Sequence, residues 1–181
     1  MSAINRPSVY LILLFTFLLQ TGKIFSQQQG KKHAVSGIIT HTRSFCGGAR
    51  PTDEMLEKFN TPQPLAGKKL YIRSGAVNNL KKRIIQTIVS DSTGHFTVYL
   101  PAGTYCLIQE PQIKKLNVEP YRKSQSQFIT LDEACLKRWW SECLLTFTVG
   151  SSGRNDLKIN FNAPCFTDGT PCLEYNGPMP P

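Results

Sequence analysis

Six cysteines and three histidines are the residues of this 181-residue chain whose types suit chemistry. No two of the cysteines have the Cys-x-x-Cys spacing that is typical of metal and redox sites. In an oxidising compartment, an even number of cysteines instead indicates a disulfide framework, for which six residues allow fifteen pairings. The residues concerned are Cys46, Cys106, Cys135, Cys143, Cys165, Cys172, His33, His41 and His95.

Two disulfide pairings are suggested by closeness in the sequence. Cys165 and Cys172 flank a loop rich in turn-forming residues and can pair with each other. Cys135 and Cys143 can pair across the end of a helix. Strand pairing can bring any two of the six together, so the connectivity stays open. Each native bridge is expected to stabilise the fold by about 2–4 kcal/mol, mainly because it restricts the unfolded chain.

A metal site or a nucleophile is the alternative role for these residues. His41 and Cys46 are candidates for a soft-metal pair, or for a small extracytoplasmic hydrolase. Two ligands do not make a metal site, and His95 lies on the outer face of a predicted strand, where a solvated histidine is expected. We therefore assign no catalytic, cofactor-binding or metal-binding residue and expect no cofactor.

Clustered acids and paired tryptophans also have a structural interpretation. The acids Asp53, Glu54 and Glu57, and then Asp132 and Glu133, stand at the starts of predicted helices, where carboxylates complement the positive helix end.

Trp139 and Trp140 form a possible interaction surface. Neighbouring positions on a helix point about 100° apart, so one ring can pack while the other meets a sugar or a protein partner. Packing of both rings between helix and sheet is the interpretation that we favour.

The N-terminus has the organisation of a secretory signal. Arg6 precedes an uncharged apolar run from Val9 to Leu19, and small or polar residues follow as far as Ser26. The run is shorter than the roughly 20 residues that span a bilayer. We predict a signal peptide over residues 1–26, no transmembrane segment in the mature chain, and a periplasmic, cell-surface or secreted protein. An oxidising compartment favours disulfides over metal ligation.

The formal net charge of +9 does not by itself indicate nucleic acid as a partner. The basic residues occur in short groups spread along the chain, with no long basic run. We expect no nucleic-acid binding. The partner is expected to be a protein or a glycan, and the oligomeric state stays open.

The stretch from Asp91 to Tyr105 organises the predicted fold. It reads as turn, strand, turn, strand, with Phe96, Val98 and Leu100 on one face of the first strand. In the first predicted strand, Gly37 indicates a bulge or a close backbone approach. Strands are predicted over 34–40, 68–73, 83–90, 95–100, 104–109, 144–149 and 157–161, and helices over 52–59 and 131–142.

This pattern predicts a mainly β fold: an antiparallel seven-stranded Ig-like or transthyretin-like sandwich, disulfide-stapled, with two short helical insertions. The expected organisation is a signal peptide over 1–26 and a polar leader over 27–33. A sandwich over 34–162 follows, with insertions at 41–64 and 111–142. A Cys/Pro-rich tail covers 163–181.

Short motifs carry a family resemblance. Val35-Ser36-Gly37-Ile38-Ile39, the stretch Leu65–Ile72, and the pattern Gly-x-Phe then Pro-x-Gly-x-Tyr within 91–105 resemble the carboxypeptidase regulatory-like, or transthyretin-like, domain. Cys-Gly-Gly-Ala-x-Pro from position 46 and the ending Gly-Pro-x-Pro-Pro are similar to small uncharacterised secreted proteins of Bacteroidetes-type bacteria. The resemblance implies an exported, non-enzymatic binding or structural module.

Overall fold

The structure is a computed structural model that describes residues 30–178. The predicted signal peptide and its cleavage after Ser26 lie outside the described residues. Within the described part of the chain, no helix has the length and apolar character needed to cross a membrane.

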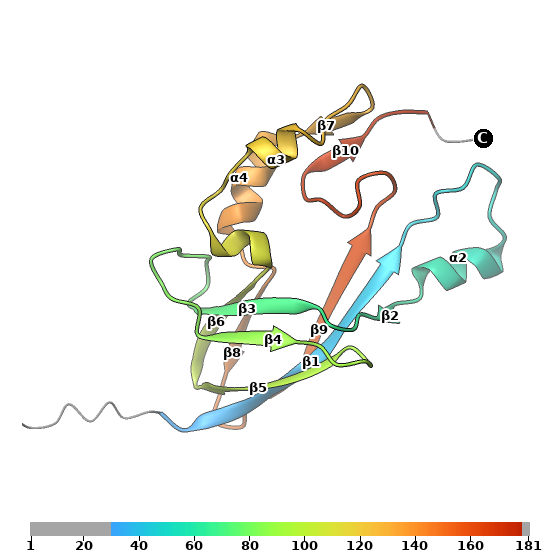
Figure 1. Cartoon of the computed structure of the whole chain (residues 1–181). Coiled ribbons are helices and arrows are strands. Elements are labelled where there is room, and N and C mark those ends of the chain that lie inside the picture. The colour runs from blue at the N-terminus through green and yellow to red at the C-terminus, as the bar shows by residue number, and fades with distance from the viewer. Residues whose placement is uncertain (1–29, 179–181) are drawn as a thin grey trace, which may run out of the picture.

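Two four-stranded sheets face each other and share one hydrophobic core, which makes the fold a β-sandwich (Figure 1). The first sheet contains β1 (Lys32–Arg43), β2 (Gln63–Pro64), β5 (His95–Pro101) and β9 (Arg154–Ala163). The second contains β4 (Gln86–Val89), β3 (Lys69–Ser74), β6 (Gly103–Ile108) and β8 (Leu145–Val149), in that order. A separate two-stranded sheet pairs β7 (Ile129–Leu131) with β10 (Leu173–Tyr175). The helices are α2 (Asp53–Asn60), α3 (Glu119–Arg122) and α4 (Glu133–Ser141), and a 3₁₀ turn, η1, spans Glu110–Ile113.

Both sheets contribute alternate residues to the core, as the period-2 pattern predicts. In β5, Phe96, Val98 and Leu100 are buried while His95 and Tyr99 are exposed. Each large apolar side chain buried in this way stabilises the fold by about 1.5–3 kcal/mol. The shared core consists of Val35, Ile39, Leu70, Ile72, Ile88, Phe96, Val98, Leu100, Tyr105, Leu107, Phe147, Val149, Leu157 and Ile159.

The predicted count of seven strands is wrong, because the described residues form ten strands in three sheets. All seven predicted strands are present with shifted ends. The three additional strands, β2, β7 and β10, are two or three residues long. A segment of that length carries no periodic signal, since alternation needs about four residues to be recognised.

The first and last strands of the sandwich run parallel, which corrects the prediction of a wholly antiparallel fold. In the β1–β9 pair, Ile39 lies opposite Ile159 and His41 opposite Phe161. The register shifts at Gly37, where an added Cβ would meet the backbone of Leu157. The close backbone approach predicted at Gly37 is thus confirmed.

The disulfides join Cys46 to Cys165, Cys106 to Cys143, and Cys135 to Cys172. Both local pairings suggested by the sequence are therefore wrong. For Cys135 and Cys143 there is a simple physical reason. Helix α4 continues from Cys135 to Ser141, a rise of about 9 Å, and Cys143 lies two residues beyond its end, whereas disulfide-bonded Cα atoms are usually within about 7 Å. Cys165 instead bonds Cys46, which follows the end of β1, and Cys172 bonds Cys135 on α4.

The insertion between β6 and β8 covers the outer face of the second sheet. Cys106 and Ile108 on that face are fully buried, as is Leu136 of α4. Asn78 fastens the insertion, because its side-chain nitrogen donates to the carbonyls of Gln112 and Trp140 at 3.0 and 2.8 Å. The Cys106–Cys143 bridge adds a covalent link at the same place.

Candidate functional site

The inner face of β1 changes from apolar to basic toward its end. Val35 and Ile39 are completely buried in the core, and His41 and Arg43 follow them at alternate positions, on the same face of the strand. Figure 1 shows β1 and β9 extending side by side beyond the second sheet. His41 and Arg43 stand on this extension, where the second sheet no longer covers them.

Helix α2 supplies the opposite wall of the site. Its N-terminus is capped by Thr52, whose hydroxyl accepts a hydrogen bond from the Met55 amide at 3.3 Å. None of its residues is fully buried. Phe59 in its last turn meets Phe45 edge to face, with ring centroids 5.5 Å apart. This contact holds the end of α2, and with it Lys58, beside β1.

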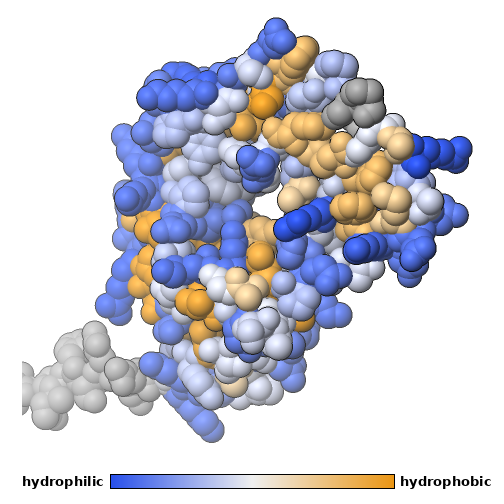
Figure 2. Space-filling view, turned by 45° about the vertical axis from the view of Figure 1, so that its right-hand side comes forward, coloured by the Kyte–Doolittle hydropathy of each residue, from blue (hydrophilic) through white to orange (hydrophobic). Residues whose placement is uncertain are grey.

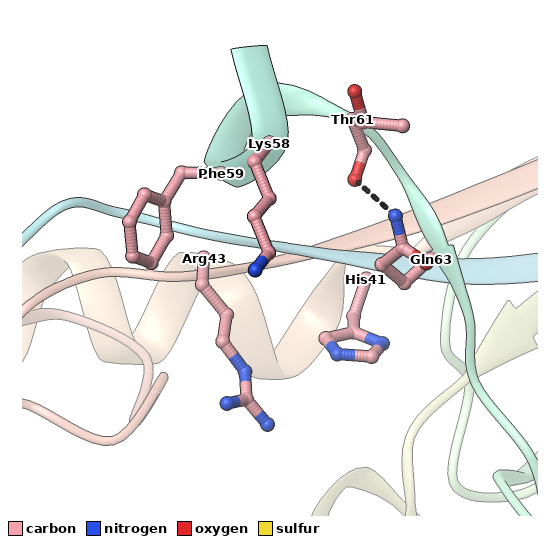
Figure 3. Close-up of a pocket in the computed structure, with 6 residues that line it drawn as sticks. All are labelled: His41, Arg43, Lys58, Phe59, Thr61 and Gln63. Carbon is pink, nitrogen blue, oxygen red and sulfur yellow. Dashed lines mark hydrogen bonds between the residues drawn. The ribbon is translucent and has the colours of Figure 1, made fainter. Parts of the chain in front are cut away.

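These elements enclose a pocket of about 350 Å³. Figure 3 shows Lys58 reaching from α2 toward the space between Arg43 and His41. The amide of Gln63 is held by a 3.3 Å hydrogen bond to the Thr61 carbonyl. The lining residues are His41, Arg43, Lys58, Phe59, Thr61 and Gln63.

The charge of the pocket lining is positive. Arg43 and Lys58 carry full charges, and no lining residue is acidic. The ion pairs found over residues 30–178 involve Arg122 and Arg154 rather than these two cations. In addition, Nδ1 of His41 is buried and makes no hydrogen bond within the protein. A buried polar atom without a partner costs about 1–3 kcal/mol, so the His41 ring carries an uncompensated polar group behind the pocket wall.

A further cation lies next to the pocket. The Lys68 ammonium sits 4.3 Å from the ring centroid of Phe161, the β9 residue opposite His41. Burial lowers the pKa of Lys68, while the charge of Glu110 acts in the other direction. The positive field at this end of the sandwich therefore has contributions from three elements: β1, α2 and the segment before β3.

The pocket continues into an adjoining one of about 390 Å³ that includes Arg43, Phe59 and both cysteines of the Cys46–Cys165 bridge. Phe166 borders it and stacks on Tyr175, with centroids 4.2 Å apart. Figure 2 shows hydrophobic side chains gathered at the upper right, beside a hollow, in the part of the molecule that holds α2 and β10. The disulfide ties the tip of the β1–β9 extension together, which gives this region a fixed shape.

The structure does not support the alternative that pairs His41 with Cys46. Cys46 is bonded to Cys165, so its sulfur is neither a thiolate ligand nor a nucleophile. No group of three potential metal ligands occurs among residues 30–178. The acids at helix starts act in part as expected, since the Asp132 carboxylate caps α4 by accepting from the Cys135 amide at 2.9 Å.

The tryptophans and His95 lie away from this pocket. Trp140 is buried, and its indole nitrogen donates to the Lys114 carbonyl at 2.7 Å. Trp139 is half-buried and meets Trp140 edge to face, so it alone of the pair is available to a ligand. His95 is on the exposed face of β5, as expected, and its Nδ1 lies 3.0 Å from the Thr93 hydroxyl.

Sequence reasoning missed Arg43 and Lys58. The predicted first strand ended at position 40, so Arg43 fell in a presumed loop. The available signal was the alternation itself, since positions 35, 39, 41 and 43 share one face if the strand continues. Nothing in the sequence pointed to Lys58, because it reaches this strand only through the packing of α2.

Comparisons with known proteins add little. No family model and no curated protein matches the chain. One solved structure that it resembles is a double-mutant form of the shaft pilin SpaA from Lactobacillus rhamnosus GG. The sequence identity is 10%, the TM-score is 0.33, and the match covers 81% of this chain and 52% of the pilin chain. The chain thus spans about half the length of that protein, and a likeness this weak carries no argument.

Proposed function

We propose that this chain is an exported, non-enzymatic binding module, and that its ligand occupies the pocket between β1, α2 and β2. The observation that carries the proposal is the basic, open pocket at the end of the β1–β9 extension, beside the Cys46–Cys165 bridge. Pockets of roughly 300 Å³ and more that combine apolar walls with a few convergent polar groups are the usual form of ligand sites.

The disulfides support export. All six cysteines are paired in three bridges, and such bridges persist in oxidising compartments such as the periplasm or the cell exterior. The choice between periplasm, cell surface and medium is open in this proposal.

The carboxypeptidase regulatory-like interpretation remains part of the proposal. Its two motifs fall at the turns that bound β5: Gly94, which has a positive φ of 79°, precedes the strand, and Pro101 and Gly103 end it and begin β6. Domains of this kind serve as accessory or interaction modules, which agrees with a binding role, although a shared fold does not fix function.

Protein-observed NMR against a mixed library of glycans and short peptides tests the proposed function. We expect amide shifts to concentrate at residues 41–45 and 57–64, with the ligands unchanged after incubation. Shifts confined to the surface around Trp139 would move the binding site to α4. Chemical conversion of a ligand by the purified protein would refute the non-enzymatic assignment.

A further inference from the structure

We propose that the pocket between β1, α2 and β2 takes a small organic carboxylate. This inference rests on the proposed function, which locates binding at the same place, and it adds the chemical class of the ligand. It follows from the charge, the donor geometry and the apolar wall of the pocket.

The first step is the unbalanced charge. Lys58 and Glu54 are four residues apart on α2, a spacing that permits an ion pair, yet the two form none within 4 Å. The adjoining pocket holds one carboxylate, that of Asp168, and it does not pair with Arg43 either. Both cations at the pocket are therefore free to bind an anion.

The second step is the donor geometry. A guanidinium group presents a planar fork that matches the two oxygens of a carboxylate, and an ammonium group adds a point charge. Figure 3 shows the Lys58 side chain directed between Arg43 and His41, so donors from α2 and β1 meet at one place. The imidazole ring of His41 borders the same place.

The third step is the rest of the lining. The ring of Phe59 and the aliphatic stems of Arg43 and Lys58 form the remaining, apolar wall. Inorganic phosphate or sulfate would leave this wall without contact. A volume of about 350 Å³ is at the small end of the range for ligand sites. The expected ligand is thus a carboxylate on a body of monosaccharide or amino-acid size.

Isothermal titration calorimetry with matched pairs of probes tests the inference. The pairs are D-glucuronate against D-glucose, and N-acetylphenylalanine against its primary amide, because a uronic acid and a peptide terminus are two sources of the same group. We expect one carboxylate to bind at least tenfold more tightly than its neutral partner. Added salt should weaken that binding, since both cations are exposed.

Charge-removing variants link the binding to the pocket. Combined Arg43→Gln and Lys58→Gln substitutions should weaken the preferred carboxylate at least tenfold. Combined Lys81→Gln and Arg83→Gln substitutions, which remove the same charge from an exposed loop elsewhere, should leave the affinity unchanged. Arg43→Lys keeps the charge but loses the forked guanidinium group. Its affinity for the carboxylate should therefore lie between the affinities of the two double variants. This single variant also serves as the test if the double variant fails to fold.

Equal affinity for the charged and neutral members of both pairs would overturn the inference, as would binding that survives the Arg43 and Lys58 substitutions. Tight binding of inorganic phosphate without carboxylate binding would also overturn it. In each case, NMR shifts at residues 41–45 and 57–64 with another library ligand would leave the proposed binding function intact. If no library ligand shifts these residues, the result counts against the proposed function itself.

Discussion

Replacing Gln112 by alanine should destabilise the protein by removing the polar link between α4 and the η1 turn that follows β6. Gln112 is 1% exposed. Its side-chain oxygen accepts from the Gln109 amide at 2.8 Å, and its nitrogen donates to the carbonyls of Trp139 and Glu142 at 2.6 and 2.9 Å. Two of these bonds satisfy carbonyls at the C-terminal end of α4, which the helix itself leaves without partners.

The size of the effect follows from these three hydrogen bonds. A typical hydrogen bond contributes about 1 kcal/mol net, and a buried group left without a partner costs about 1–3 kcal/mol. Water can reach the exposed Glu142 carbonyl region, and Gln109 and Trp139 are half-buried. Because water can replace some of the lost hydrogen bonds, we expect the free energy of unfolding to fall by about 2–4 kcal/mol. This is less than the sum of the largest penalties for three buried groups left without partners.

Urea denaturation followed by tryptophan fluorescence and by far-ultraviolet circular dichroism measures this change with the disulfides intact. The matched control is Gln127→Ala, which removes an exposed glutamine from the same insertion and should change stability by less than about 0.5 kcal/mol. A loss below about 0.5 kcal/mol for Gln112→Ala would refute the argument that this side chain fastens α4.

Three further predictions concern the sandwich itself. Gly37→Ala should cost more than about 2 kcal/mol by forcing apart the β1–β9 backbones at Leu157, and a melting temperature equal to that of the parent would contradict this. Arg73→Met should cost about 1–3 kcal/mol, since this buried guanidinium donates to three backbone carbonyls; an unchanged urea midpoint would count against it. The pKa of Asp91 is lowered, chiefly by the hydrogen bond from the Thr93 hydroxyl. Stability from this carboxylate is therefore present above its unfolded-state pKa and lost as the pH falls through the folded-state pKa. NMR titration should show a higher Asp91 pKa in Thr93→Ala than in Thr93→Ser, and equal values would exclude the hydroxyl as the cause.

The sequence predicts the parts of this fold that depend on local periodicity. Strand β5 was recognised because one face is buried and the other is in water, so its residues alternate. The start of α2 is predicted because acids at the beginning of a helical pattern complement the positive helix end, as Asp53 and Glu54 do here. These signals are carried by residues that are near one another in the chain.

Pairing between distant segments was not predictable in the same way. Ile39 and Ile159 lie opposite each other in parallel strands, and no alternation pattern distinguishes this from an antiparallel arrangement. The cysteine pairs had the same difficulty, because each joins segments at least 37 residues apart in the chain. The pocket combines Arg43 of β1 with Lys58 of α2, and such a combination exists only after the chain has folded.

The most direct test of the account is mass-spectrometric mapping of the protein purified from its native cells, without reduction. We predict the linkages Cys46–Cys165, Cys106–Cys143 and Cys135–Cys172, together with a mature N-terminus close to Gln27. An intact N-terminal segment on a folded protein whose six cysteines are free thiols would contradict an exported, disulfide-stabilised binding module.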